Sequence, residues 1–490
     1  MRNVLSNHRA DLSTIAAWAM YSRGLEPDFP DSVINQLSHM PEPAKETDES
    51  IRDLTALPWC SIDNDDSLDL DQLTAIESLS NGTVRAYVAV ADVDSMVKKG
   101  SPIDEHARLN TTSVYTSARV FPMLPIQLCT DLTSLNQDEK RLAVVTVMVF
   151  NELGVLVESN HFRAVVQNKA KLAYDAVSAW MEGEIDLPEP ARKIAGMDVQ
   201  LRMQDTLAQK LKLLRRSLGS LEFETFQPHA VFENNKIIGI RQQPHNRARQ
   251  LIEELMIATN VCTARFLAAQ GIPSLRRVVR SPERWLRIME VAYRYGTSLP
   301  YEPNGEALQA FLAQQHKQDP LRFPDLSLVV IKLMGSGEYV VEYARGPSIG
   351  HFGLAVQDYM HSTAPNRRYP DLITLRLLKS ALTGEQSPYS IPELEALAAH
   401  CTAQEDAAKK VERQLRKSEA ALLLHDRVGE AFEGIVTGSG EHGTWVRIFT
   451  PPVEGRLKNS SPATRVGQKV RVKLLSTSVE RGFVDFVIAN

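Results

Sequence analysis

Apolar residues recur with helical spacing near the start of the chain. The spacing over residues 10–40 predicts two helices, with apolar positions on one face of each. Residues 41–50 (PEPAKETDES) break this pattern and are typical of a linker. We therefore predict that residues 1–50 form a small helical N-terminal module.

From Leu68 the pattern changes to the alternation that indicates strands. The segments LDLDQLTAIE and TVRAYVAVADV flank Asn81-Gly82, and Asn-Gly between two such alternations predicts a β-hairpin. A second strand pair is predicted over 141–150 and 155–166, joined through 151–154, with a helix near Lys171–Met181.

The chain beyond this helix is mainly helical in pattern. Long helices are predicted at 248–271, where Gly271 serves as the C-cap, and at 369–382. Together with the strands, these elements predict a mixed α+β body over residues 51–425.

The last stretch, from Gly429, alternates apolar and polar residues in about five short segments separated by glycine. This spacing predicts a small closed barrel over 429–490. Each of its aromatic residues is more simply read as core, and the alternative is that one or two stack on nucleic-acid bases. These residues are Phe432, Trp445, Phe449 and Phe483, and the basic side chains nearby are Arg447, Lys469, Arg471 and Lys473.

Composition narrows the class of protein. The 490 residues are 43% hydrophobic and 23% charged, which is typical of a globular protein with two or three domains. No apolar run is long enough for a signal peptide or a membrane span, so we expect a cytoplasmic protein that makes no membrane contact. The four cysteines are far apart, which argues against a disulfide framework and against a zinc site.

The net charge of −5 is unusual for a protein that binds nucleic acid, because phosphate contacts need basic residues. The basic residues are nevertheless clustered, and clusters could line a channel or could simply be solvated helix faces. The three runs are Arg276, Arg277, Arg280, Arg284 and Arg287; Arg367 and Arg368; and Lys409, Lys410, Arg413, Arg416 and Lys417.

Five aspartates stand within nine residues of the segment SIDNDDSLDLDQL, with no lysine or arginine between Arg52 and Arg85. Such a cluster must be solvated, protonated or neutralised by a cation, and carboxylates select hard cations such as Mg²⁺, Mn²⁺ or Ca²⁺. An EF-hand loop is excluded, since Leu68 stands where that loop needs glycine and Thr74 where it needs glutamate. An exposed acidic turn fits poorly beside the apolar 59–62 segment. We therefore predict a metal site suited to phosphodiester hydrolysis.

Across residues 51–490 the chain resembles the RNase II/RNase R family of exoribonucleases. Asp63, Asp69 and Asp71 match the first three positions of the family's acidic cluster, whereas Gln72 stands where a fourth aspartate is usual. The resemblance implies a Mg²⁺-dependent enzyme, with Mn²⁺ as a possible substitute. Such an enzyme shortens single-stranded RNA from a free 3′ end and releases 5′-mononucleotides.

Three further segments carry the resemblance and imply RNA contacts. TTSVYTSARVFPMLP places Tyr115 where a ring stacks on a base near the 3′ end, and LGSLEFE places Phe223 as a second aromatic clamp opposite it. QLIEELMIATN is similar to a helix that brings Glu253 or Glu254 near the terminal sugar. By pattern alone, Tyr115 could pack between strands and the glutamates could be a solvated helix face.

The segment GHFGLAVQDYMHSTAPNRRYPDL resembles the family's most specific signature. It implies that Arg367 grips the phosphate beside the metal and acts in catalysis with Asp71, and that Arg368 belongs to the RNA-binding residues. Ala364 and Asn366 depart from the serine and isoleucine of the signature.

The resemblance also implies that the C-terminal barrel is an antiparallel OB-fold that binds RNA. The family's two N-terminal cold-shock barrels have no counterpart in the predicted helical module. A rival interpretation is a catalytically weakened RNA-binding protein that uses the same channel, and Gln72 keeps it open. We expect a monomer, while the natural RNA targets, the tolerance of duplex and the limit-product length do not follow from the sequence.

Overall fold

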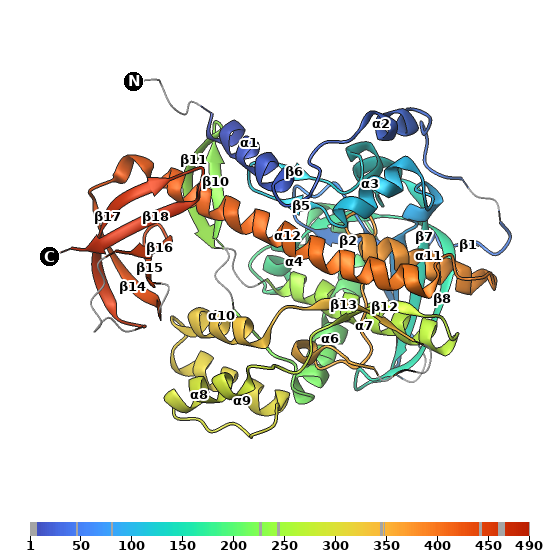
Figure 1. Cartoon of the computed structure of the whole chain (residues 1–490). Helices are drawn as coiled ribbons and strands as arrows, with labels where there is room; N and C mark the ends of the chain where they lie inside the picture. The colour runs from blue at the N-terminus through green and yellow to red at the C-terminus, as the bar shows by residue number, and fades with distance from the viewer. Residues whose placement is uncertain are drawn as a thin grey trace.

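The computed structural model describes residues 7–45, 48–79, 82–224, 228–242, 246–343, 346, 348–440, 443–458 and 466–489. A body of mixed helices and strands fills the larger part of the molecule, and the C-terminal barrel forms a lobe at one side (Figure 1). The mixed fold class and the C-terminal barrel predicted from the sequence are both confirmed.

A seven-stranded sheet lies at the centre of the body, in the order β1-β8-β7-β4-β3-β2-β9. Its middle strands are antiparallel, whereas β1 and β9 pair in parallel at the two edges. The strands are β1 (Arg52–Asp53), β2 (Cys60–Asp63), β3 (Gln72–Ser78), β4 (Val84–Ala91), β7 (Lys140–Phe150), β8 (Leu156–Gln167) and β9 (Ala170–Ala173).

Both predicted strand pairs are present as the hairpins β3–β4 and β7–β8. In the predicted turn, Asn81 lies outside the described residues, and Gly82 has the positive φ of +71° that glycine adopts without strain. The helix expected near Lys171–Met181 was wrong at its start. Residues 170–173 form β9, which pairs with β2, and the helix begins only at Tyr174.

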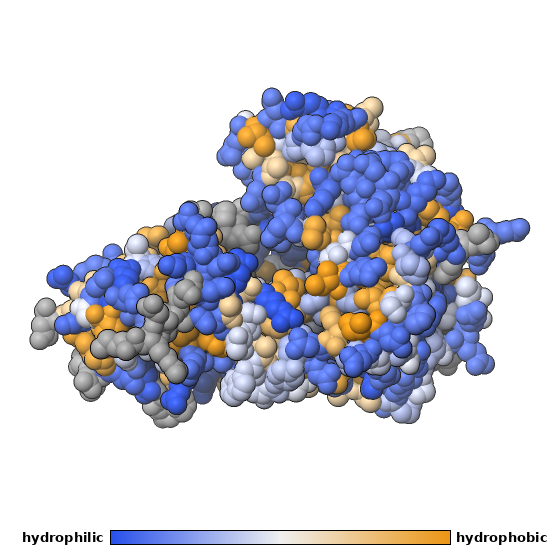
Figure 2. Space-filling model, turned by 90° about the horizontal axis from the view of Figure 1, so that it is seen from above, coloured by the Kyte–Doolittle hydropathy of each residue, from blue (hydrophilic) through white to orange (hydrophobic). Residues whose placement is uncertain are grey.

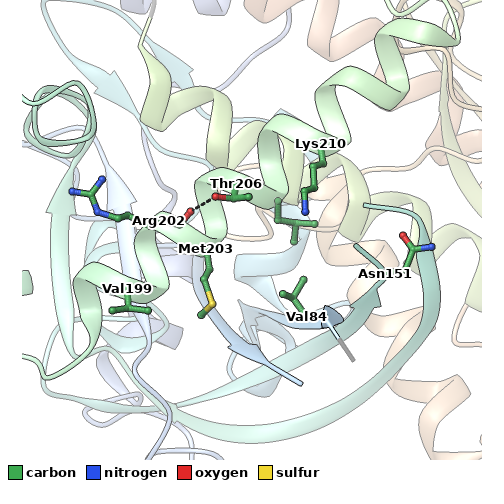
Figure 3. A pocket seen from close by; sticks show the side chains of 9 residues that line it. Val84, Asn151, Val199, Arg202, Met203, Thr206 and Lys210 are labelled. Atoms are coloured by element: carbon green, nitrogen blue, oxygen red, sulfur yellow. Dashed lines mark hydrogen bonds between the residues drawn. The ribbon is translucent and has the colours of Figure 1, made fainter. Parts of the chain in front are cut away.

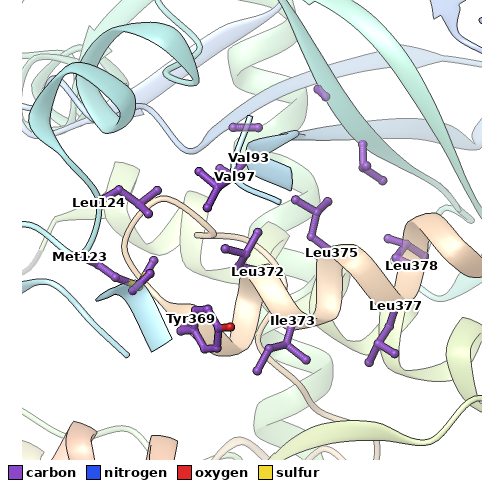
Figure 4. Close-up of a cluster of buried hydrophobic side chains, with 14 of the residues drawn as sticks. Val93, Val97, Met123, Leu124, Tyr369, Leu372, Ile373, Leu375, Leu377 and Leu378 are labelled. Carbon is purple, nitrogen blue, oxygen red and sulfur yellow. The ribbon is translucent and has the colours of Figure 1, made fainter. Parts of the chain in front are cut away.

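Helices cover both faces of the sheet. Successive residues of a strand point to opposite sides, and both sides carry apolar side chains that pack against helices. Leu73 and Ala75 of β3 share a core with α11 and α12, part of which is shown in Figure 4. Ile76 of β3 and Val88 of β4 share the other core with α6 and α7. The covering helices are α3 (Pro102–Asn110), α4 (Tyr174–Met181), α5 (Glu189–Arg192), α6 (Met197–Ser217), α7 (Arg247–Ala269), α11 (Tyr369–Thr383) and α12 (Ile391–Leu423).

Two of these helices are those predicted from the sequence. The helix expected at 248–271 is α7, and Gly271 follows its end with a φ of +71°, as a residue just past a helix C-terminus often does. The helix expected at 369–382 is α11.

A group of helices with its own small core stands apart from the central sheet. Trp285, Phe311 and Phe323 lie in this core. Its members are α8 (Trp285–Arg294), α9 (Gly305–Gln318) and α10 (Phe323–Met334), and the strand pairs nearby in the sequence are β10 (Pro228–Glu233) with β11 (Lys236–Gln242) and β12 (Ser274–Val278) with β13 (Glu338–Glu342). The sequence pattern did not predict these four strands.

The first fifty residues contain the two expected helices, α1 (His8–Tyr21) and α2 (Asp31–Ser38). They pack on the rest of the chain: Leu12 and Ala16 of α1 share a core with Ala408 and Val411 of α12. The division of the chain at residue 50 stays a prediction.

The C-terminal strands close into a barrel in the order β14-β15-β16-β18-β17. Phe432 lies in its core beside Phe486, whereas Phe449 and Phe483 are exposed. The strands are β14 (Ala431–Gly440), β15 (Gly443–Ile448), β16 (Glu454–Leu457), β17 (Lys469–Ser478) and β18 (Phe483–Ile488).

The helix α12 is 33 residues long and takes part in three cores. Leu394 and Leu397 lie in the core of the body, Ala408 and Val411 pack against α1, and the last turns reach the barrel core through Ala421. In Figure 1 this helix crosses the molecule from the body to the barrel.

Hydrophilic residues cover most of the face seen in Figure 2, with small groups of hydrophobic side chains between them. Within the described part of the chain, no helix is both long enough and apolar enough to cross a bilayer.

Candidate active site

The acidic loop joins two neighbouring strands of the central sheet. β2 ends at Asp63 and β3 begins at Gln72, so the loop lies at one end of the sheet. Backbone groups hold it in place: the Leu135 N–H donates to the carbonyl of Leu70 at 3.0 Å, and the Ala91 N–H donates to the carbonyl of Asp71 at 3.0 Å. The loop therefore has a fixed backbone despite its repelling charges.

Asp71 meets the arginine segment that lies almost 300 residues further along the chain. Its Oδ2 accepts a hydrogen bond from Arg367 Nε at 3.1 Å, and its Oδ1 accepts one from the backbone N–H of Asn366 at 3.0 Å. Asp71 is only 2% exposed, and this burial raises its pKa to about 7 although Arg367 favours the charged form. The structure thus brings together the two residues predicted to act in catalysis.

Asp63 lies in the same electrostatic environment. Burial raises its pKa to about 6, while Arg367 opposes the shift and Asp69 adds to it. Its Oδ2 is buried without a hydrogen-bond partner among the described residues. A buried carboxylate oxygen with no donor is costly, and a bound cation is one way of satisfying it.

Tyr115 joins this group through Asp69. The Tyr115 hydroxyl donates to Asp69 Oδ2 at 3.1 Å, and the Tyr115 side chain remains 42% exposed. Tyr115 is in the short strand β5 (Val114–Tyr115), which pairs with β6 (Val120–Phe121). An exposed ring beside the carboxylates is available for stacking.

The predicted metal ligands match Mg²⁺ in the kind of donor they offer. Carboxylate oxygens suit this cation, and the unsatisfied Oδ2 of Asp63 fits a site that needs one. Among the described residues, however, no three acidic, histidine or cysteine side chains are gathered as a metal site, and Asp71 faces Arg367. Asp65 and Asp66 are exposed to solvent.

The two neighbouring arginines have different surroundings. Arg367 donates to Asp71 through Nε, and its side chain is 39% exposed. Its two terminal nitrogens, Nη1 and Nη2, make no hydrogen bond within the described residues. Arg368 Nη2 instead donates to Asp371 Oδ1 at 2.7 Å, and Asp371 is fully buried. Arg367 is thus the one that can offer two free donors to a phosphate.

Phe223, Glu253 and Glu254 line a separate pocket of about 500 Å³. Glu254 is 2% exposed and forms a two-point ion pair with Arg215, in which Nε lies 2.9 Å from Oε2. Glu253 is exposed. Phe223 packs against the helical core that contains Trp285, and no ring contact joins it to Tyr115 among the described residues.

Helix α7 connects this pocket with the acidic loop. Arg249, in its first turn, donates to Asn64 Oδ1 at 2.5 Å and lies over the ring of Tyr174. Glu253 comes four residues later and therefore lies on the same face of the helix, one turn further on. One rigid element thus carries contacts to both sites.

Several arginines that the sequence offered as free positive charges are paired with acidic residues. Arg276 pairs with Glu342, Arg277 with Glu405, and Arg280 with Glu338. In the barrel, Arg447 forms a two-point pair with Asp325 of α10 at 2.7 and 3.1 Å. The sequence around these arginines gave no sign of their acidic partners, because the partners lie in distant segments of the chain.

Another pocket, of about 280 Å³, lies where α6 faces the central sheet (Figure 3). Its wall includes Val84, Val199 and Met203, and Arg202 beside it lies over the ring of Trp180. It contains none of the predicted site residues.

Two family models match separate stretches of the chain. The RNB domain model matches residues 51–384, and the model of the RNase II-type exonuclease C-terminal S1 domain matches residues 430–489. Ribonuclease R of Aquifex aeolicus is 30% identical over 495 residues, which cover 94% of this chain and 68% of that protein. Ribonuclease R of Escherichia coli is 29% identical, with 94% of this chain and 60% of that protein covered. The chain thus spans about three fifths to two thirds of these relatives.

Solved structures show the same fold. The apo form of Mycoplasma genitalium RNase R superimposes with a TM-score of 0.86 at 22% identity, covering 99% of this chain and 78% of that one. Its complex with ribose-methylated single-stranded RNA gives 0.87, with the same identity and coverage. Yeast Ssd1, a pseudonuclease, gives 0.67 at 17% identity, covering 85% and 51%.

The match to the RNB model extends over more than half of the chain, and the S1 match coincides with the closed barrel. The resemblance drawn from the acidic loop and the Arg367 segment is therefore confirmed, and the chain belongs to the RNB-domain family that includes Ribonuclease R and the RNase II-type exonucleases.

Proposed function

We propose that this chain is a hydrolytic 3′–5′ exoribonuclease that degrades single-stranded RNA to 5′-mononucleotides. The observation that carries the proposal is the contact between Asp71 and Arg367, with Tyr115 and Asp69 beside it. These contacts bring carboxylates, a guanidinium and an exposed ring together, which supports a site for an RNA phosphate and its base. The family and the relatives named Ribonuclease R support the same activity.

In this proposal Arg367 holds the scissile phosphate. Its Nε is oriented by Asp71, so Nη1 and Nη2 are presented as a pair to two phosphate oxygens. The same charge then stabilises the negative charge that develops during in-line attack. Tyr115 stacks on a base near the 3′ end and fixes the distance between that base and the phosphate.

The pocket lined by Phe223 and Glu253 receives a neighbouring nucleotide. The exposed carboxylate of Glu253 is a hydrogen-bond acceptor for ribose hydroxyls, which supports a preference for RNA over DNA. Glu254 contributes indirectly, because its carboxylate is already bound by Arg215. Stacking and phosphate contacts carry no base code, so sequence preference should be slight.

Mg²⁺ is the proposed cofactor, with Mn²⁺ as a possible substitute, and Asp63, Asp69 and Asp71 would hold it. When bound, the ion supplies an acidified water and charge stabilisation for phosphodiester hydrolysis. The unsatisfied Oδ2 of Asp63 and the raised pKa of both Asp63 and Asp71 support a need for positive charge here. Whether one or two ions bind depends on Gln72, whose neutral amide is a weaker ligand than a carboxylate.

The rival function is RNA binding through the same channel without efficient cleavage. Gln72 in the acidic cluster favours it, because a neutral amide is a weaker metal ligand than a carboxylate. The fold is compatible with this rival, since yeast Ssd1, a pseudonuclease, shares it.

A single experiment separates the two functions. A 5′-labelled single-stranded RNA is incubated with the protein in Mg²⁺ or in EDTA and resolved on a denaturing gel. Progressive shortening to a short limit product in Mg²⁺ alone supports the enzyme. Binding in a gel-shift assay, with intact RNA under both conditions, supports the rival.

We further propose that the protein acts in the cytoplasm as a monomer. Four buried cysteines without disulfide bonds are compatible with a reducing compartment. RNA with a free 3′ end is the proposed partner.

A further inference from the structure

The position of Asp71 depends on one turn in the arginine segment. Both of its carboxylate oxygens accept hydrogen bonds from this turn, one from the Asn366 backbone N–H and one from Arg367. Whatever holds the turn therefore also sets the geometry of the proposed catalytic pair.

The side chain of Asn366 reaches across to a third segment. Its Oδ1 accepts a hydrogen bond from Thr133 Oγ1 at 2.5 Å. Thr133 is the residue that follows a short π-helix (Leu128–Leu132), and its hydroxyl also lies 2.9 Å from the carbonyl of Leu128. π-Helical turns are rare and are frequent at functional sites.

The residues that follow Thr133 hold the acidic loop itself. Ser134 Oγ accepts from the Leu70 N–H at 3.0 Å and lies 2.8 Å from the carbonyl of Leu68. The Leu135 N–H donates to the carbonyl of Leu70. The segment Thr133–Leu135 therefore contacts both halves of the site: the acidic loop through two residues and the arginine turn through Thr133.

Burial makes the contact between Thr133 and Asn366 consequential. Thr133 is 5% exposed and Asn366 is 1% exposed, so neither side chain can exchange its partner for bulk water. Losing one partner of a buried hydrogen bond leaves the other unsatisfied, at a cost of about 1–3 kcal/mol. Asn366 Nδ2 already has no partner among the described residues, so the Thr133 bond is the contact that fixes its amide.

We propose that Thr133 and Asn366 are positioning residues, which keep Asp71 and Arg367 in register through a hydrogen bond between their side chains. This inference rests on the proposed exoribonuclease activity. Asn366 stands where the resembling signature has isoleucine, an apolar residue that cannot accept a hydrogen bond from Thr133. This hydrogen bond is thus a feature of this chain. It holds the turn that contains Asn366 and Arg367 against the segment that contacts the acidic loop.

The test compares two substitutions at one position. Thr133→Val removes the hydroxyl and keeps the shape, whereas Thr133→Ser keeps the hydroxyl. For shortening of 5′-labelled single-stranded RNA in Mg²⁺, we expect kcat of Thr133→Val to fall about tenfold with KM within about twofold of wild type. Thr133→Ser should stay within about twofold of wild type for both constants.

Two further measurements separate positioning from a loss of folding. Thr130→Val is the matched control, because among the described residues Thr130 Oγ1 bonds only the carbonyl of Ile126 in its own helix, and it should leave kcat unchanged. In the double variant Thr133→Val/Asn366→Ile, adding Asn366→Ile should lower kcat much less than Asn366→Ile lowers it in the wild type. Both changes remove the same hydrogen bond. RNA affinity measured by anisotropy in EDTA should stay within about twofold of wild type in Thr133→Val, because the charge of Arg367 is unchanged and only its orientation is lost.

Defined outcomes would overturn the inference. Wild-type kcat in Thr133→Val, an equal loss in Thr133→Ser, or a kcat that merely follows the folded fraction by circular dichroism would each do so, provided that the wild type cleaves. If the wild type leaves RNA intact in Mg²⁺ and Mn²⁺, the proposed function fails, and this inference fails with it.

Discussion

Two of the carboxylate–arginine pairs in this structure, Glu254–Arg215 and Asp71–Arg367, differ in how completely they are closed. Glu254 and Arg215 meet at two points, and only 15% of the Arg215 side chain is exposed. Asp71 and Arg367 meet through one guanidinium nitrogen, and 39% of the Arg367 side chain is exposed. The first pair satisfies its own charges, whereas the second leaves donors that a ligand can use.

The surroundings reinforce this difference. Arg215 also donates to Ser220 Oγ at 2.8 Å, so it connects α6 with the segment that leads to Phe223. Beside Asp71, by contrast, Asp63 has an unsatisfied oxygen and Tyr115 presents an exposed ring. We conclude that the closed pair, Glu254–Arg215, stabilises the fold of its pocket. The open pair, Asp71–Arg367, lies beside unsatisfied groups and is where we expect the reaction to occur. The predictions below test this contrast.

The largest effect is expected at the open pair. Asp71→Asn should reduce kcat for single-stranded RNA by a factor on the order of 10³, because it removes both a proposed metal ligand and the partner that orients Arg367. RNA affinity in EDTA should not fall, since a negative charge is lost. Asp65→Asn is the matched control in the same loop, where the side chain is exposed, and it should stay near wild type. Equal activity of Asp71→Asn and wild type would contradict the assignment.

Breaking the closed pair should act on stability instead. Arg215→Met leaves Glu254 buried without its partner, which costs about 3 kcal/mol of unfolding free energy. The measurement is urea unfolding followed by circular dichroism. The double variant Arg215→Met/Glu254→Leu should recover much of the loss, because no buried charge remains unpaired. A loss of kcat as large as that of Asp71→Asn in a fully folded Arg215→Met protein would break the contrast.

Arg367→Lys probes the need for the guanidinium fork. Lysine keeps the charge, but it cannot bond Asp71 and two phosphate oxygens in one plane, so kcat should fall about 100-fold. Arg368→Lys is the neighbouring comparison. It should lower kcat much less, because Arg368 is turned to Asp371. Steady-state kinetics on one RNA measures both, and equal losses would show that the two arginines share the role.

The smallest effect concerns a buried carboxylate with no ion pair among the described residues. Glu419 accepts a hydrogen bond from Ser117 and is 3% exposed, and burial raises its pKa to about 7 from an ordinary value of 4.5. The folded state therefore holds the proton more tightly, and stability is lost as the pH rises from about 4.5 to about 7.

Glu419→Gln should remove about 2 kcal/mol of this pH dependence. Thermal unfolding of both proteins at pH 5 and pH 8 measures the difference. The wild type should lose more stability than the variant between these values, and Glu385→Gln at an exposed position should behave as the wild type. Parallel curves for the wild type and Glu419→Gln would contradict the raised pKa.

Local patterns predicted the elements that local forces decide. The alternation after Leu68 gave the β3–β4 hairpin, and the five short segments after Gly429 gave the closed barrel. The hairpin β10–β11 was missed, although Asn234 and Asn235 adopt the positive φ values that asparagine tolerates in tight turns. The strand β9 was read as helix because four residues carry too little periodicity, and its pairing with β2 decides its conformation.

The sequence could not show which side chains from distant segments contact each other in the site. Motifs brought Asp63, Asp69, Asp71 and Arg367 to attention, but the direct Asp71–Arg367 bond was not foreseen. Glu253 or Glu254 was predicted to lie near the terminal sugar, and the ion pair between Glu254 and Arg215 joins segments that the motif does not connect. Thr133 was never singled out, because a threonine after an apolar run carries no local sign of a partner more than 200 residues away.

The length of helix α12 has a mechanical consequence. Its 33 residues run as one rod of about 50 Å whose two ends are anchored in different cores. Adding one residue midway would turn the barrel by about 100° around the rod and displace it by about 1.5 Å. The orientation of the C-terminal barrel relative to the body is thus set by the number of residues in α12.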